Sequence, residues 1–159
     1  MRYFVIYLTF CLLVTGCSQQ KVKQDWIIIE TYESGMPRIK RSLDLNADGC
    51  YSYRELYPSG KLKLTGNWKD EKRVGLWKSF YEENEQLWSF GDYVNGVRHG
   101  RSVIYHENGI IMMTGFYANG KMDSIWINID KNGDTLNVAQ YRDGMLVFNS
   151  SKTLVAPLR

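Results

Sequence analysis

The sequence predicts an all-β protein: an elongated antiparallel meander of consecutive β-hairpin repeats that form a single sheet. An internal period is the main observation, because Trp68, Tyr93, Tyr117 and Tyr141 follow one another at intervals of 25, 24 and 24 residues. Each unit has two turns rich in glycine, and the runs of five to eight residues between them are too short for ordinary helices. Each hairpin should therefore contact chiefly its neighbours along the chain.

Residues 1–16 are typical of a signal peptide. Arg2 gives the segment its positive charge, and an apolar run of twelve residues follows from Tyr3 to Val14. A membrane-spanning helix needs about 20 apolar residues, so this run better fits the apolar region of a signal peptide. The motif Val14–Cys17 resembles the lipobox of bacterial lipoproteins, which implies cleavage before Cys17 and attachment of lipid to its sulfur. A plain signal peptide that contains a cysteine is the alternative.

The mature chain is close to neutral and has one free thiol. Removing residues 1–16 from 159 leaves 143 and lowers the formal net charge from +3 to +2, because Arg2 is the only charged residue removed. Cys11 is lost with the signal and Cys17 carries lipid, which leaves Cys50 and excludes an intramolecular disulfide. This charge gives no reason to expect a nucleic-acid partner.

Four segments follow the signal peptide. Residues 17–24 are polar and are predicted to be a tether, and residues 25–54 are predicted to form N-terminal strands. The repeats proper are assigned to residues 55–148 and a C-terminal tail to residues 149–159. A degenerate repeat within 25–54 is a further interpretation, since the sequence YESG at 32–35 precedes YPSG at 57–60 by 25 residues.

Recurring glycines suggest two structural roles. Asn-Gly at 108–109 and 132–133 favours tight hairpin turns with positive φ, and Asn-Gly at 95–96 and 119–120, with Asp-Gly at 143–144, marks the second turn of each unit. Gly66, Gly91 and Gly115 each lie two residues before an aromatic residue, which is Trp68, Tyr93 and Tyr117 in turn. A glycine there opens a slot in which a ring from a neighbouring strand can lie over the backbone. The alternative is that these glycines are bulge or turn residues.

The units resemble the MORN-repeat variant of bacterial proteins, many of which are described as antitoxins of the YwqK type. The resemblance covers residues 55–148 and rests on the recurring form Y-x-x-N-G-x-L-x-x-x-G-x-Y-x-N-G-x-x-x-G-x-W. It implies a twisted single sheet of hairpins that serves as a binding scaffold. Three positions depart from the pattern, with Glu85 in place of glycine, Ser102 in place of tryptophan and Ala139 in place of glycine.

The segment from Asp44 to Glu55 matches the pattern of a calcium-binding loop. Asp44, Asn46 and Asp48 alternate before Gly49, and Glu55 occupies the closing position. An EF-hand requires flanking helices, whereas Cys50–Tyr53 alternates as a strand does. We therefore expect a β-turn between two strands with no metal, and a calcium loop outside the EF-hand class is the open alternative.

No catalytic motif stands out in the sequence. There is no nucleophile elbow, zinc-protease motif, phosphate-binding loop or dinucleotide fingerprint. His99 and His106 fit no metal-ligand spacing with Cys50 and are interpreted as surface residues. We therefore expect neither enzyme activity nor a cofactor.

Aromatic side chains are the remaining candidate for function. Most should pack on the sheet itself, and some should form an exposed stripe on which a partner docks. Trp88 is the candidate partner-binding residue, because strict alternation would turn it away from Leu87 and Tyr93. The leading hypothesis is a lipoprotein of the bacterial cell envelope that binds a protein partner, in the manner of an antitoxin or immunity factor that binds a toxin. The alternative is a structural envelope protein that recognises glycans or lipid headgroups.

Overall fold

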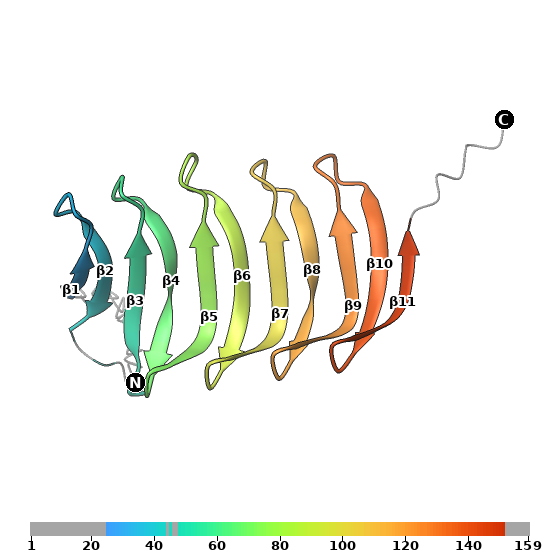
Figure 1. Ribbon diagram of the computed structural model, residues 1–159, viewed down its shortest axis with the longest axis horizontal. Helices are drawn as coiled ribbons and strands as arrows, with labels where there is room; N and C mark the ends of the chain where they lie inside the picture. The colour runs from blue at the N-terminus through green and yellow to red at the C-terminus, as the bar shows by residue number, and fades with distance from the viewer. Residues whose placement is uncertain (1–24, 44, 46–47, 152–159) are drawn as a thin grey trace, which may run out of the picture.

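The computed structural model describes residues 25–43, 45 and 48–151, which form one open sheet and no helix. Eleven strands lie in chain order, each antiparallel to the next (Figure 1). The strands are β1 (Trp26–Thr31), β2 (Pro37–Ser42), β3 (Tyr51–Leu56), β4 (Leu62–Lys69), β5 (Lys72–Phe80), β6 (Leu87–Val94), β7 (Val97–Tyr105), β8 (Ile111–Ala118), β9 (Lys121–Ile129), β10 (Thr135–Arg142) and β11 (Met145–Ser151). The predicted all-β meander of hairpins is confirmed.

Turns of one kind join the strands at the upper end in Figure 1, and they repeat from β1 to β10. Each is closed by a backbone hydrogen bond from its first residue, as from Tyr32 N to Met36 O and from His106 N to Ile110 O. The turn at 81–86 is one residue longer, and Glu85 takes a φ of 58° there. This is a conformation in which a residue with a Cβ is disfavoured, and glycine occupies the equivalent place in the other turns.

A ladder of side-chain hydrogen bonds links these upper turns. Tyr32, Tyr57 and Tyr81 donate their hydroxyls to backbone carbonyls of the next repeat at 2.7 to 2.9 Å. His106 occupies the same place, and its Nε2 lies 2.9 Å from Ile129 O. The acceptor in every case directly precedes the next member of the series, so each repeat is fastened to the following one. The segment 25–54 takes part through Tyr32, which favours its interpretation as a degenerate repeat.

The lower turns in Figure 1 lie at the Asn-Gly and Asp-Gly pairs predicted to mark the second turn of each unit, and they are tight hairpins. At 108–109 and 132–133, where tight hairpins were predicted, the turns are five residues long and only the glycine has a positive φ. Asn95 and Gly96 have φ values of 50° and 85°, and the pairs at 119–120 and 143–144 repeat this geometry. Asp70 and Glu71 adopt it as well, without glycine. Gly96 N also donates to Arg73 O in the preceding hairpin, at 2.9 Å. The turn glycines therefore bridge successive hairpins as well as reversing the chain.

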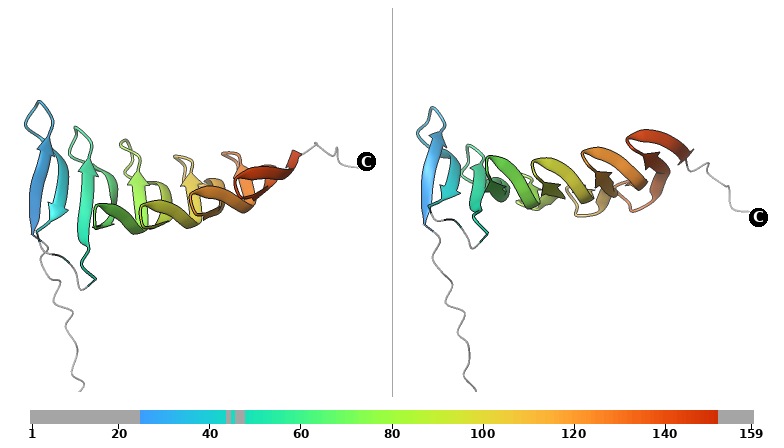
Figure 2. Two further views of the ribbon diagram at one scale, coloured as in Figure 1. Left: turned by 60° about the horizontal axis from the view of Figure 1, so that its bottom comes forward. Right: turned by 90° about the horizontal axis from the view of Figure 1, so that it is seen from below.

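The strands bend near their middle rather than running flat. Gly75 in β5, Gly100 in β7 and Ser124 in β9 have φ values of 63°, 105° and 59°, and register shifts occur beside all three. A bulge of this kind kinks one strand and increases its local twist. Figure 2 shows the result as a row of lower hairpins that curl over to one side of the sheet.

The core of this single sheet is small. The buried apolar residues are Cys50, Trp77, Val103, Trp126 and Ala139, and the buried polar residues are Ser42 and Ser102. Many large apolar side chains remain exposed, as expected for a sheet with no covering layer.

The C-terminal edge extends further than predicted. β11 runs to Ser151 and so includes the first three residues of the tail predicted at 149–159. Asn149 pairs with Ala139, and its side-chain oxygen accepts a hydrogen bond from Asn137 Nδ2 at 2.9 Å. The polar sequence there lacks an apolar signal, but cross-strand amides sustain the pairing.

Candidate binding site

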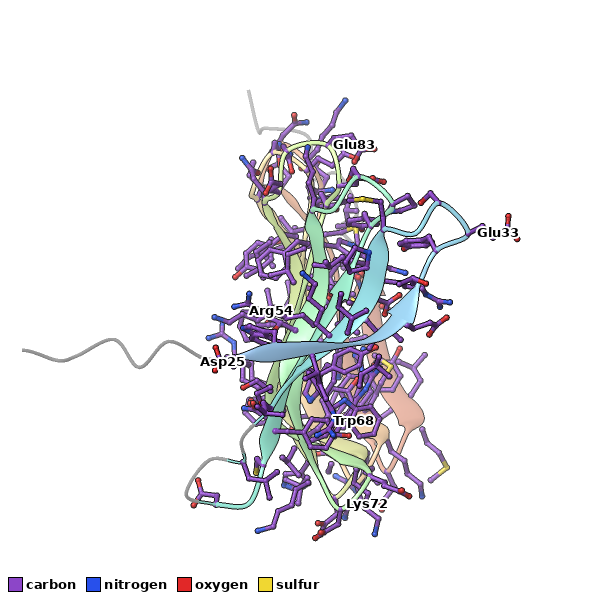
Figure 3. The ribbon with its side chains drawn as sticks, turned by 90° about the vertical axis from the view of Figure 1, so that its left-hand side faces the viewer. Asp25, Glu33, Arg54, Trp68, Lys72 and Glu83 are labelled. Atoms are coloured by element: carbon purple, nitrogen blue, oxygen red, sulfur yellow. The ribbon has the colours of Figure 1, made fainter. Side chains whose placement is uncertain are left out.

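One face of the sheet carries a row of aromatic rings, which we call the aromatic face: Tyr53, Trp68, Trp77, Tyr93, Tyr117 and Trp126. Trp77 is at the centre of the first part, with ring centroids 5.5 Å from Tyr53, 5.7 Å from Trp68 and 6.2 Å from Tyr93. Seen end-on in Figure 3, Trp68 and Arg54 lie on opposite sides of the strands, with the turn of Lys72 at one end and that of Glu83 at the other.

Two glycines make room for buried indoles on this face. A Cβ added to Gly66 would overlap the ring of Trp77, and one added to Gly115 would overlap the ring of Trp126. The two indoles are 3% and 1% exposed. The predicted slot is confirmed at both glycines, and the register shifts that lie beside them show that slot and bulge occur together. Trp126 Nε1 also donates to Phe116 O at 3.0 Å.

The third slot, over Gly91, holds no indole. Ser102 occupies the place equivalent to Trp77 and Trp126, and its Oγ lies 3.6 Å from the position of an added Gly91 Cβ. A hollow of about 270 Å³ lies here, open on one side. We call it the central hollow, and its lining residues are Tyr57, Lys63, Leu64, Arg73, Trp77, Ser79, Trp88, Ser89, Phe90, Gly91, Tyr93, Arg98 and Ile104.

Two arginines border the central hollow. The Arg73 guanidinium carbon lies 4.3 Å from the Trp77 ring centroid and 5.6 Å from that of Tyr93. Arg98 lies 5.7 Å from Tyr93 and 5.3 Å from Tyr117, and so joins the two parts of the aromatic row. It also donates from Nε to the Tyr93 hydroxyl at 3.0 Å and from Nη1 to Ser102 Oγ at 3.4 Å.

Trp88 lies at the rim of this hollow and is 44% exposed. Strict alternation predicted that it faces away from Tyr93, yet both residues line the same hollow. The register shifts between Ser79 and Phe80, opposite Leu87 and Ser89, so Trp88 lies at an irregular point of β6 where strict alternation does not hold. Its ring contacts Tyr81 at 6.3 Å. Trp88 remains accessible to a partner.

Polar groups complete the floor and one wall. Ser79 and Ser89 share a hydrogen bond of 2.6 Å between their hydroxyls. Lys63 Nζ lies 2.9 Å from Glu55 Oε1, and this hydrogen bond raises the pKa of Lys63. Burial raises the pKa of Tyr57, which also lines the hollow, so its phenol stays neutral at ordinary pH.

The predicted calcium loop is only partly within the described residues, since Asp44 and Asn46 lie outside them. β2 ends at Ser42 and β3 begins at Tyr51, so strands flank the loop, as predicted, and not the helices of an EF-hand. Glu55 lies within β3 and pairs with Lys63, and Asp48 precedes the strand. The structure described here contains no group of three or more His, Cys, Asp or Glu residues suited to a metal ion.

The other predicted residues fall into two groups. His106 takes part in the ladder, and the backbone N of Asn119 donates to His99 Nδ1 at 3.4 Å. The signal peptide, the tether and Cys17 lie outside the described residues. Within the part that is described, no helix is long and apolar enough to cross a membrane.

One comparison with known proteins supports the repeat. Residues 98–119, from β7 to the turn after β8, match the MORN repeat variant family. The comparison with curated proteins found no match. Among solved structures, the crystal structure of TarM aligns with 72% of this chain at 17% identity and a TM-score of 0.26. This chain spans 19% of the length of TarM, and the likeness does not bear on function.

Proposed function

We propose that this chain is a lipoprotein of the bacterial cell envelope that binds a protein partner on its aromatic face, in the manner of an antitoxin or immunity factor. The match to a MORN repeat variant supports a repeat-based binding scaffold. We assign the scaffold no catalytic step and no cofactor. The membrane attachment is proposed from the lipobox-like motif before Cys17.

The central hollow is the observation that carries this proposal. Protein interfaces concentrate their binding energy in tryptophan, tyrosine and arginine residues around fully desolvated pockets. The hollow brings together these three residue types, with Trp77 buried at its wall, Trp88 exposed at its rim and Arg98 across it. The equivalent places in the neighbouring repeats are filled by indoles, so this is where the aromatic face can accept a side chain from outside.

Crosslinking from envelope preparations tests the binding role. The full-length protein carries a photoreactive group beside the hollow, and the crosslinked proteins are identified by mass spectrometry. We expect one protein to be enriched with wild type and lost with Trp88→Ala. Phe116→Ala is the matched control, because Phe116 is 51% exposed and pairs with Arg101 on the other face. Equal loss with both variants, or no dependence on Trp88, contradicts a partner site at the hollow.

Lipid attachment is tested separately. The wild type should incorporate labelled palmitate and fractionate with membranes, whereas Cys17→Ser should do neither. A Cys17→Ser variant with unchanged mass and membrane fractionation would contradict the lipoprotein assignment.

A further inference from the structure

The arginines of the central hollow lack acidic partners. Among residues 25–43, 45 and 48–151, the ion pairs join Arg38 to Glu30, Lys61 to Glu85 and Lys63 to Glu55. Neither Arg73 nor Arg98 takes part in one, and both guanidiniums contact aromatic rings instead. Lys63 is neutralised by Glu55, so the uncompensated charge of the hollow is that of the two arginines. This charge favours an anionic ligand.

The surroundings define which kind of anion fits. Guanidinium groups bind carboxylates through paired N–H donors, and stacking against Trp77 and Tyr93 holds the Arg73 group in place. The Ser79 and Ser89 hydroxyls lie in the same lining and supply further polar contacts. The rings of Trp77 and Trp88 provide apolar walls. A ligand with a carboxylate next to an apolar group therefore fits the hollow, because the carboxylate can bind the arginines and the apolar group can pack against the tryptophan rings.

The size of the hollow favours a peptide over a polysaccharide. A volume of about 270 Å³ accommodates one or two side chains. Recognition of an extended glycan would require further subsites along the sheet, but Trp77 and Trp126 occupy the equivalent slots on either side. A single anchoring pocket in the centre of a face is the arrangement that protein interfaces use.

We propose that the central hollow binds an acidic side chain, Asp or Glu, next to an apolar residue in an exposed segment of the partner protein, with Arg98 and Arg73 as the groups that hold its carboxylate. This inference rests on the proposed protein-binding function and specifies the chemistry of the same site. Arg98 is the more exposed of the two and bridges Tyr93 to Tyr117, so it is the residue to change first.

Selection from a random displayed heptapeptide library tests the assignment on the full-length protein in mild detergent. We expect wild type to enrich peptides with Asp or Glu beside an apolar residue. Their affinity should fall about tenfold or more with Arg98→Gln, since a hydrogen bond to a charged group is lost. Arg54→Gln is the matched control, because it removes the same charge but lies against Trp26, on the opposite side of the strands from Trp68 (Figure 3).

The outcomes separate the two proposals. Acid-rich peptides that lose affinity with Arg98→Gln and keep it with Arg54→Gln support the assignment. Peptides that depend on Trp88 but show no acidic preference, or that lose equal affinity with both arginine variants, overturn the carboxylate assignment and leave protein binding intact. Absence of any peptide dependent on Trp88 or Arg98 overturns both. A fourth outcome is that no peptide is enriched and that hexuronate oligosaccharides bind in a way that depends on Arg98. This result overturns the proposed peptide ligand and indicates an acidic glycan instead.

Discussion

The slots over Gly115 and Gly91 lie at equivalent backbone positions, but the first is filled by an indole and the second is open. At Gly115 the indole of Trp126 lies directly on the glycine and is 1% exposed. At Gly91 the opposing residue is Ser102, and the space above the strand stays open as the central hollow. The repeat therefore supplies a slot that is either filled by an indole or left as an open hollow, and the residue opposite the glycine decides which.

Arg98 shows how the scaffold compensates for the missing ring. It restores contact along the aromatic row by lying against both Tyr93 and Tyr117, and it donates to Ser102 Oγ. A cation at this point continues the row without filling the slot. The central repeat therefore has less buried aromatic packing than its neighbours and presents an accessible positive charge in its place.

Adding a methyl group to each slot glycine should separate the two regions most strongly. In Gly115→Ala the new Cβ overlaps the Trp126 indole, which is packed on all sides, so we expect a loss of about 2 to 3 kcal/mol in the free energy of unfolding. In Gly91→Ala the nearest atom is 3.6 Å away, and the change should be below about 0.5 kcal/mol. Urea unfolding followed by circular dichroism measures both. Equal losses would show that the slots do not differ as described.

Filling the central slot should make it resemble its neighbours. In Ser102→Trp the indole should lie over Gly91 and displace Arg98, since Trp77 and Trp126 take that position in the adjacent repeats. Filling a cavity of this kind commonly adds about 0.5 to 2 kcal/mol. The same variant should lose partner binding, which crosslinking measures alongside the urea midpoint. A variant that keeps full binding would contradict the role of the hollow.

The period and the turns carried most of the fold prediction. Glycines at fixed spacing require positive φ at Gly96, Gly120 and Gly144, and the aromatic anchors fix which face each strand presents. The end of β11 was not predicted, because a hydrogen bond between the side-chain amides of Asn137 and Asn149 holds it in place, and no apolar pattern marks it in the sequence. The tyrosine ladder was not predicted either, although the recurrence of Tyr32, Tyr57 and Tyr81 was visible in the sequence.

The site was harder to predict because it depends on a missing side chain, the indole that would fill the slot over Gly91. Ser102 was identified as a departure from the pattern, but its consequence depends on three strands meeting around Gly91. Trp88 was selected through an alternation argument that a register shift overturns, although it does lie at the hollow. Arg73 and Arg98 occupy equivalent positions 25 residues apart, and both guanidiniums lie near the Tyr93 ring. The charge pattern within a single repeat does not show that these two residues come together.

The ladder of hydrogen bonds between the upper turns should contribute equally to stability in successive repeats. Tyr57→Phe and Tyr81→Phe each remove a hydroxyl that donates to a backbone carbonyl, Phe80 O or Tyr105 O, at 2.9 and 2.7 Å. We expect each to lower the free energy of unfolding by about 0.5 to 1.5 kcal/mol, the usual value of such a bond. Urea midpoints compare them. A loss confined to one variant would show that the repeats are not fastened in the same way.

The smallest effect should come from alkaline pH and should arise from four groups between β3 and the turn after β5, of which Tyr57 and Lys63 line the central hollow. Burial raises the pKa of Tyr53, Tyr57 and Tyr81 above 10.0, and the hydrogen bond to Glu55 raises that of Lys63 above 10.5. The folded state holds these protons more tightly than the unfolded chain does.

The sign of the effect follows from linkage. Below pH 10 both states carry the protons, so stability is constant there. As pH rises past 10 the unfolded chain releases protons first, and the free energy of unfolding declines. We expect the urea midpoint to be level from pH 8 to about 9.5 and to fall by pH 11. Tyr53→Phe should make the fall shallower, because one phenol no longer titrates. Phe116→Leu, which removes no titrating group, is the control and should leave the slope as in wild type. A midpoint that rises with pH would contradict the direction of these pKa shifts.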